Sequence, residues 1–216
     1  MDRSCVAIVI PAFNEAETIG EVVTTAMPLG LPIVVDDGST DMTRAEAEKA
    51  GAIVVCHSAN AGYDAALNSG FAKAAELSFL YVVTTDADGQ HDPTDLSRVI
   101  EHLERGADLV AGVRDRKQRI SEYLFAWFGR WRWGIHDPLC GLKGYRMAVY
   151  CELGHFDAYQ SIGTELAIFA AQRRKRLEQI LVVTRERRDT PRFGRRLNGN
   201  IKILRAMWIA LLESCG

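Results

Sequence analysis

One stretch decides how the chain is interpreted: YVVTTDADGQHD, residues 81–92. It begins as a short apolar, β-branched run, which predicts a buried strand over 79–85. Asp86 and Asp88 follow directly, and a glycine then lets the chain turn. Carboxylates at a strand end suit a hard divalent cation such as Mg²⁺ or Mn²⁺, which prefers oxygen ligands. An acidic turn in which Asp95 caps the next helix is the plainer interpretation, and the D-x-D pattern alone does not decide between the two.

Strands and helices alternate on both sides of this stretch. Apolar runs predict further buried strands over 5–10, 33–35, 52–56 and 108–111. The segments between them predict helices from 14 or 15 to 26, over 42–50 and 64–76, and from 94 or 95 to 105. This alternation is typical of an α/β fold with a mostly parallel central sheet and helices on both faces.

Polar residues follow three of these strands, at the edge where nucleotides bind in such sheets. A G-x-G-x-x-G after the first strand is absent, and so is a phosphate loop ending in Gly-Lys-Ser or Gly-Lys-Thr. These absences argue against a nicotinamide enzyme and against a P-loop kinase.

Composition describes an ordinary globular chain with an uneven charge distribution. The 216 residues are 48% hydrophobic and 25% charged, which fits one domain with a sizeable core. Residues 1–113 hold 6 basic and 18 acidic residues, whereas 114–216 hold 20 basic and 10 acidic residues. An acidic half suited to a metal therefore precedes a basic half suited to anions.

The five cysteines are scattered, odd in number and without metal-finger spacing, which predicts reduced thiols in a cytoplasmic protein. No signal peptide is visible, and no apolar run reaches the roughly 18 residues that span a bilayer.

Four motifs occur in order: VAIVIPAFNE at 6–15, VVDDGSTD at 34–41, NAGYDAALNSGF at 60–71 and TDADGQHDP at 85–93. Together they resemble the nucleotide-diphosphosugar half of a family 2 glycosyltransferase with the GT-A fold. The polyprenyl-phosphate branch, which includes dolichol-phosphate mannosyl- and glucosyltransferases, is most similar. The resemblance covers 5–114 and, more loosely, 137–194. It implies one GT-A domain over 1–216, with a nucleotide-sugar half at 1–114 and an acceptor-side half at 115–216 that ends in an amphipathic helix.

The resemblance assigns a donor pocket to the first two motifs. It implies that Pro11, Phe13 and Glu15 line the pocket for the base and ribose, and that Asp37 contacts one of them. Asp64 stands where relatives often have glycine, so we expect no phosphate-binding role for that turn.

The same resemblance makes Asp86 and Asp88 the D-x-D pair. Asp86 would support the ribose or the metal, while Asp88 and Gln90 would reach a Mg²⁺ or Mn²⁺ ion on the diphosphate. The chemistry agrees, because the leaving group departs with growing negative charge that a cation and basic side chains stabilise.

Two arginines of the basic half are assigned to phosphate. Relatives carry an arginine after the strand at 108–111, which makes Arg114 a candidate for the diphosphate. Arg192 lies in TPRFG, residues 190–194, which resembles a mobile Arg-x-Gly stretch over the active site. A solvated charge run is the alternative, and we prefer it for Arg116 and Lys117.

The acceptor decides whether a base is needed. Asp137 opens a segment that resembles an acceptor-side motif of the family, with a structural ion pair to Arg146 as the alternative. A sugar hydroxyl must lose a proton, so Asp137 would be its base; Glu165 is either a base or a helix-terminal acid. A polyprenyl phosphate is already ionised and needs cations instead, which the arginines of 185–196 supply.

Aromatic residues and arginines interleave over 121–133. Core packing is the preferred interpretation for most of these rings, a membrane head-group interface comes second, and nucleic acid comes last. In a final helix, Leu197, Ile201, Leu204, Trp208 and Leu211 share one face, which predicts packing on the sheet, with peripheral membrane contact as the alternative.

The resemblance thus implies a metal-dependent, inverting glycosyltransferase at the cytoplasmic face of a membrane. It would move a sugar from a GDP- or UDP-linked donor to a polyprenyl phosphate, with no nucleic-acid partner. Transfer to a saccharide hydroxyl, a sugar nucleotidyltransferase and an inactive binding module are the alternatives. A nucleotidyltransferase usually has a glycine-rich loop and a lysine after its first strand, and residues 11–15 have neither. The donor base, the sugar and the oligomeric state stay open.

Overall fold

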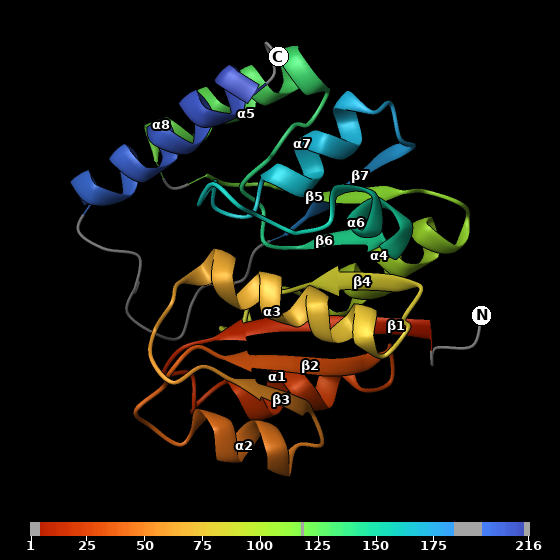
Figure 1. The fold of residues 1–216 in the computed structure, drawn as a ribbon, viewed down its shortest axis with the longest axis vertical. Coiled ribbons are helices and arrows are strands. Elements are labelled where there is room, and N and C mark those ends of the chain that lie inside the picture. The colour runs from red at the N-terminus through yellow and green to blue at the C-terminus, as the bar shows by residue number, and fades with distance from the viewer. Residues whose placement is uncertain (1–4, 118, 184–195, 214–216) are drawn as a thin grey trace.

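The computed structural model describes residues 5–117, 119–183 and 196–213, and its centre is a seven-stranded sheet (Figure 1). The strands lie in the order β3-β2-β1-β4-β6-β5-β7. Only β6 is antiparallel to its neighbours β4 and β5, so the prediction of a mostly parallel sheet is confirmed. The strand bounds are β1 Val6–Ala12, β2 Leu31–Asp36, β3 Ile53–Cys56, β4 Tyr81–Thr84, β5 Leu109–Arg114, β6 Lys143–Arg146 and β7 Leu177–Val182.

Helices cover both faces of the sheet, as predicted (Figure 1). One face packs against α1 Ile19–Ala26, α2 Thr43–Lys49 and α4 Pro93–Glu104. The other face packs against α3 Tyr63–Glu76, α5 Ile120–Trp133, α6 Met147–Leu153 and α7 Glu165–Gln172, and α8 Arg196–Glu213 packs on α5.

Strand β1 shows why both layers are needed. Its side chains alternate between the two cores: Ile8 and Ile10 pack with α1 and α4, whereas Ala7 and Val9 pack with α3. All four are fully buried. A strand that is apolar on both faces must be covered on both faces, and a buried isoleucine contributes about 1.5–3 kcal/mol.

The parallel strands β1, β2 and β4 end at the same edge of the sheet, and backbone hydrogen bonds hold the loops that follow them together. The Asp37 N–H donates to Ala12 O at 2.9 Å, and the Thr85 N–H donates to Val9 O at 3.2 Å. This edge therefore collects the polar segments after all three strands.

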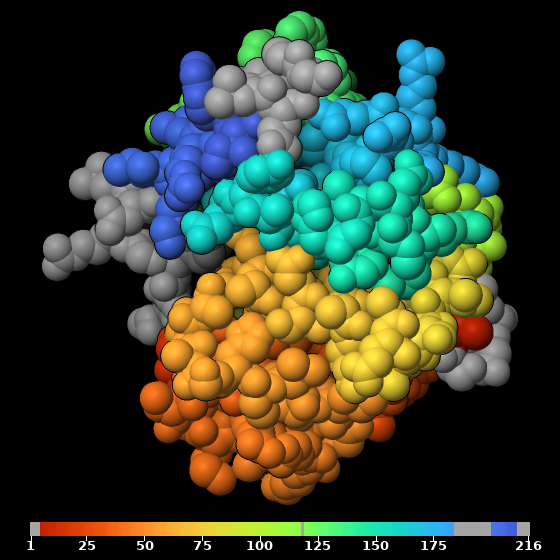
Figure 2. Space-filling view, in the orientation of Figure 1, coloured from red at the N-terminus to blue at the C-terminus, as the bar shows by residue number. Residues whose placement is uncertain are grey.

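The two halves of the chain meet along α3. In the space-filling view (Figure 2), the yellow atoms of α3 border the teal atoms of the segment between β6 and α7. Asn68 on α3 joins the two, because its Nδ2 donates to Asp157 O at 2.7 Å and its Oδ1 accepts from Phe156 N at 2.9 Å.

Two predicted helix starts were wrong. Helix α1 begins at Ile19 rather than at residue 14 or 15. The preceding segment is tied to the loop after β2 instead, since the amides of Asn14 and Glu15 donate to Ser39 Oγ and Thr43 Oγ1. Helix α4 begins at Pro93, and its cap is Asp92, which accepts from the Thr94 amide at 2.8 Å; Asp95 lies inside the helix.

The predicted packing of the final helix was also wrong. Helix α8 buries Ile203, Ala206 and Ala210 against α5, because small side chains allow the two helices to approach closely. The stripe expected to face the sheet points outward at Ile201, Leu204 and Trp208. The rings of α5 divide in the same way: Phe125 and Trp133 are buried, whereas Tyr123, Trp127 and Trp131 are exposed.

Candidate active site

The acidic loop after β4 forms the floor of the site. Asp88 is almost buried, and its Oδ1 accepts from the Gln90 amide at 3.1 Å. Gly89 has φ +72°, a conformation that favours glycine and turns the loop back beneath the strand end. The side chain of Asp86 is 34% exposed, so one acid of the pair is open to the edge of the sheet.

Asp86 lies directly against the backbone of Gly141. A Cβ atom added at residue 141 would lie 2.3 Å from Asp86 Oδ2, so any residue other than glycine would force the Asp86 carboxylate to shift. The neighbouring Thr84 hydroxyl donates to Gly141 O at 2.6 Å. The segment before β6 is thereby fixed beneath the acidic pair.

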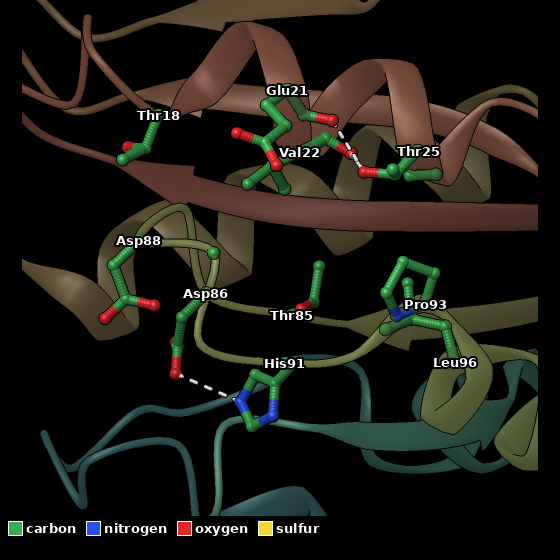
Figure 3. A pocket seen from close by; sticks show the side chains of 12 residues that line it. Thr18, Glu21, Val22, Thr25, Thr85, Asp86, Asp88, His91, Pro93 and Leu96 are labelled. Carbon is green, nitrogen blue, oxygen red and sulfur yellow. Dashed lines mark hydrogen bonds and ion pairs between the residues drawn. The ribbon is translucent and has the colours of Figure 1, made fainter. Parts of the chain in front are cut away.

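His91 also lies beside Asp86 (Figure 3). Its Nε2 is 3.5 Å from Asp86 Oδ2, and its buried Nδ1 has no hydrogen-bond partner among the described residues. A hollow of about 100 Å³ opens here between α1 and the acidic loop, lined by Thr18, Glu21, Val22, Thr25, Ala26, Thr85, Asp86, Asp88, Gly89, His91, Pro93 and Leu96. A hollow of this size holds a few water molecules, so it is a side chamber rather than room for a whole sugar nucleotide.

Two cations, the partly buried Arg114 and the buried Lys143, act on Asp86. Partial burial works to raise the pKa of Asp86, but His91, Arg114 and Lys143 outweigh it, and the pKa lies below its ordinary value. Lys143 is 4% exposed, and its Nζ donates to Gly163 O at 3.2 Å. Burial lowers the pKa of Lys143, while the negative charges around it, Asp86 and Asp137 among them, favour its charged form.

Arg114 is held by acids on two sides. Its Nε and Nη2 donate to Asp137 Oδ2 and Oδ1 at 2.8 and 3.0 Å, and its Nη2 lies 3.3 Å from Glu122 Oε2. Burial works to lower the pKa of Arg114, but Asp137 dominates and the pKa is raised. The alternative pairing of Asp137 with Arg146 is wrong: Arg146 lies instead 3.4 Å from Asp108.

The residues assigned to the donor pocket lie at the ends of β1 and β2. Pro11 is in the last part of β1, Phe13 is exposed, and Glu15 is buried and accepts from the Thr18 hydroxyl. Asp37 is buried, and it contacts His57 Nδ1 at 2.6 Å.

Asp37 also accepts hydrogen bonds from the Ala61 and Gly62 amides at 2.9 and 2.8 Å. The described contacts therefore give Asp37 a loop-shaping role, and its contact with a base or ribose stays a prediction.

Asp64 shapes the acceptor-side loop. Its carboxylate accepts from the Gly163 and Ile162 amides at 2.6 and 3.3 Å. Both of these residues have positive φ, which is unusual for isoleucine and marks a strained turn. Burial and the nearby Asp157 raise the pKa of Asp64 to about 6. Asp64 thus binds backbone amides of the acceptor-side loop, and the absence of a phosphate role for this turn stays a prediction.

Glu165 is held by the same loop. Its Oε1 lies 2.6 Å from His155 Nε2, and its Oε2 accepts from the Ala158 amide at 2.6 Å. Both carboxylate oxygens are therefore engaged, which favours a structural role for Glu165 over a base.

The protein side chains at this site would need substrate phosphates to complete the coordination of a divalent cation. Among residues 5–117, 119–183 and 196–213, no three His, Cys, Asp or Glu side chains gather as a metal site. Asp86 and Asp88 supply two carboxylates on one loop, and Mg²⁺ in phosphate sites is commonly bound by one or two carboxylates together with substrate phosphates and water. The pair thus fits a cation shared with a diphosphate, with Gln90 beside it in sequence. Arg192 lies outside the described residues.

Sequence reasoning missed three polar residues of the site. Lys143 opens β6, a short strand that was not predicted, His57 directly follows β3 at the carboxyl edge, and His91 lies within the quoted acidic stretch. An imidazole side chain after a predicted strand was the available signal for His57 and His91, whereas no sequence pattern indicated Lys143.

Comparison with known proteins identifies the fold and the family of this chain. Glucosyl-3-phosphoglycerate synthase of Mycobacterium tuberculosis, solved in complex with Mn²⁺ and UDP-glucose, superposes with a TM-score of 0.76 at 25% identity over 99% of this chain and 79% of that one. The fold is therefore that of a GT-A transferase. The model of glycosyl transferase family 2 matches residues 7–181, and the chain belongs to that family and is a glycosyltransferase.

The sequence matches to individual relatives cover different fractions of each relative's length. An uncharacterized glycosyltransferase of Mycobacterium tuberculosis is 30% identical over 99% of this chain and 97% of its own. Polyprenol monophosphomannose synthase of Mycolicibacterium smegmatis is 31% identical over 66% of this chain and 62% of its own. An uncharacterized protein of Methanocaldococcus jannaschii is 40% identical, but the match spans only 48% of its length. Membership of the family excludes the nucleotidyltransferase alternative.

Proposed function

We propose that this glycosyltransferase is metal-dependent and inverting, and that it moves a sugar from a nucleoside-diphosphate sugar to a polyprenyl phosphate at the cytoplasmic face of a membrane. One observation carries the proposal: Asp86, of the acidic pair at the end of β4, lies within the electrostatic influence of two cations, the partly buried Arg114 and the buried Lys143, which lower its pKa. Such a site suits a diphosphate leaving group, whose charge the cations offset.

The proposed division of labour follows the two halves, 1–114 for the donor and 115–216 for the acceptor. Pro11, Phe13, Glu15 and Asp37 would bind the base and ribose. Asp86, Asp88 and Gln90 would hold Mg²⁺ or Mn²⁺, which when bound acts as a Lewis acid on the diphosphate. The solved relative with UDP-glucose and Mn²⁺ supports this assignment without extending to the sugar.

In the transfer step, an oxygen of the acceptor phosphate bonds to the anomeric carbon while the bond to the donor diphosphate breaks. The acceptor oxygen is already ionised, so no side chain needs to remove a proton. Arg114 is positioned by Asp137 and Glu122 to offset the charge on the departing diphosphate, and we assign Arg192 to a phosphate as well. The engagement of Asp137 and Glu165 in other contacts supports an acceptor that needs no base.

The names of two relatives support the acceptor. One is polyprenol monophosphomannose synthase, and another, 37% identical over 59% of this chain and 38% of its own, is the undecaprenyl-phosphate 4-deoxy-4-formamido-L-arabinose transferase of Pseudomonas fluorescens. Transfer to a saccharide hydroxyl is the alternative within the family, and Asp137 would then be the base.

A transfer assay separates these acceptors. Purified chain is incubated with UDP-glucose or GDP-mannose, with Mn²⁺ or EDTA, and with undecaprenyl phosphate or an oligosaccharide mixture. The proposal predicts a glycosylated lipid phosphate only when Mn²⁺ is present. Transfer to the oligosaccharides alone, or transfer that EDTA does not reduce, contradicts it.

A further inference from the structure

Helices α5 and α8 lie side by side at one end of the molecule (Figure 1). Their first turns are joined, because the Ser121 hydroxyl donates to Asn200 Oδ1 at 2.6 Å. Each helix buries one apolar stripe, with Phe125 and Trp133 on α5 and Ala206 and Ala210 among the buried residues on α8. The packing of the pair is thus complete without the rest of their apolar side chains.

Each helix carries a second apolar stripe that faces outward. The exposed large side chains are Ile120, Tyr123, Leu124, Trp127 and Trp131 on α5, and Ile201, Leu204 and Trp208 on α8. Their spacing of three or four residues places each set along one side of its helix. Trp127 and Trp131 are 70% and 72% exposed, and Trp208 is 62% exposed. Isolated exposed apolar residues are ordinary, but an aligned set of this size marks an interaction surface.

The charges on this surface have one sign. Arg130, Arg132, Lys202 and Arg205 are exposed between the apolar side chains. The one acid of α5, Glu122, is buried against Arg114, and residues 200–210 contain no acid. We call the two outward stripes and these four basic residues the Trp-Arg face. Tryptophan and arginine in this mixture are typical of helices that lie in the head-group region of a bilayer, with the basic residues attracted to anionic lipid.

The Trp-Arg face adjoins the site. Glu122, in the first turn of α5, lies 3.3 Å from Arg114 Nη2, and Asp137 follows the end of the same helix. The two acids that hold Arg114 therefore lie on, and directly after, the helix that would contact the bilayer. None of the helices, as far as the chain is described, is long and apolar enough to cross a membrane, so the helices would lie along the surface.

We propose that the Trp-Arg face is the surface through which this chain binds a membrane that contains anionic lipid, with α5 and α8 lying in the head-group region. The inference deepens the proposed function, and it rests on that function only for the reason why the site should face a bilayer. A second copy of the chain is the other occupant, and the experiment below distinguishes it from a bilayer.

The chain offers a selective probe. All four tryptophans, Trp127, Trp131, Trp133 and Trp208, lie on α5 and α8, so tryptophan emission reports on this helix pair alone. The purified chain is mixed with vesicles of phosphatidylcholine and 30% phosphatidylglycerol that contain no polyprenyl phosphate. We expect flotation with the vesicles, a blue shift of the emission and quenching by brominated acyl chains. Vesicles of phosphatidylcholine alone should bind less.

Variants locate the contact. Trp127→Ser with Trp131→Ser should weaken vesicle binding by at least about tenfold, since two large apolar side chains leave the lipid. Arg130→Gln and Arg205→Gln should each weaken it about fivefold. The matched control is Leu80→Ser with Leu181→Ser, which removes two exposed leucines elsewhere, keeps every tryptophan and should bind as the parent does.

Three results overturn the proposal. They are no flotation with 30% phosphatidylglycerol, equal flotation of the tryptophan double variant, and self-association by light scattering that this variant abolishes. Because the vesicles carry no acceptor, their binding does not depend on sugar transfer. Vesicle binding together with no transfer to undecaprenyl phosphate in the separate transfer assay therefore refutes the proposed function alone. Transfer to undecaprenyl phosphate in detergent without vesicle binding refutes the membrane surface alone.

Discussion

Arg114 and Asp137 form two parallel hydrogen bonds, of 2.8 and 3.0 Å, between one guanidinium and one carboxylate. Asp137 also accepts from the Arg114 amide at 3.2 Å, and it is 1% exposed. This carboxylate therefore links the end of β5 to the segment after α5 and fixes the arginine whose charge acts on Asp86.

Removal of one partner of this buried pair should be costly. We expect Asp137→Asn to lower the free energy of unfolding by about 3 kcal/mol, because a buried guanidinium loses its closest counter-charge. The double variant Arg114→Met with Asp137→Leu should lose less, since no unpaired charge is left. Urea unfolding followed by circular dichroism measures both, and a value for Asp137→Asn within about 0.5 kcal/mol of the parent would refute the pairing.

Gly141→Ala tests the contact beneath the acidic pair. The new methyl group would overlap the Asp86 carboxylate, so we expect a loss of about 1–3 kcal/mol in the free energy of unfolding. Binding of UDP or GDP that depends on Mn²⁺ should weaken as Asp86 moves. Gly20→Ala is the control: its methyl group meets only Glu46 Oε2 at 4.0 Å, and alanine favours the helix. Equal behaviour of the two variants would contradict the account.

Asp64 gives the chain a pH dependence of defined sign. Its pKa is raised from 3.8 to about 6, so between these values the folded chain holds a proton that the unfolded chain has released. Stability therefore falls as pH rises from about 4 to 6.

Asp64→Asn should remove this contribution. From about pH 4 to 6, the free energy of unfolding of the variant should rise relative to that of the parent by on the order of 2 kcal/mol. One pKa unit corresponds to about 1.4 kcal/mol, and solvent screens part of the shift. Chemical unfolding at several pH values measures it. A constant difference between variant and parent from pH 4 to 7 would show that Asp64 does not titrate in this way.

The variant Glu165→Gln tests whether Glu165 is a general base or a structural residue. Loss of a general base typically costs 10²–10⁴-fold in rate. Since Glu165 is engaged by His155 and the Ala158 amide, we expect transfer to undecaprenyl phosphate to fall by no more than about tenfold. A loss of three orders of magnitude with an unchanged melting temperature would make Glu165 the base.

The donor half was predictable because its signals are local. Buried apolar runs such as Ile8 to Ile10 need cover on both faces, and acids that follow parallel strands must meet at one edge. The fold class and the place of Asp86 and Asp88 followed from these two rules. Helix starts were less predictable, because the amides of Asn14 and Glu15 bond to side chains 25 and 28 residues away.

The acceptor half depends on contacts that the sequence does not display. Strand β6 has four residues, among them a lysine and an arginine, and it runs antiparallel between β4 and β5, so no periodicity indicated it. The pairing of Asp137 with Arg114 depends on that topology. For α8, one stripe of large apolar residues and one of small residues compete for the buried face, and the small residues win because they allow close approach to α5.

The central claim is that Asp88 helps to bind a cation shared with a nucleoside diphosphate, and thermal unfolding tests it most directly. With saturating UDP or GDP, the parent should show a higher melting temperature in the presence of Mn²⁺ than with nucleotide alone, and ligand at 100 times its Kd adds about 2.7 kcal/mol. Asp88→Ala should lose this Mn²⁺-dependent rise, whereas Glu76→Ala, which removes an exposed acid on α3, should keep it. An Asp88→Ala variant with the same Mn²⁺-dependent rise as the parent would contradict the account.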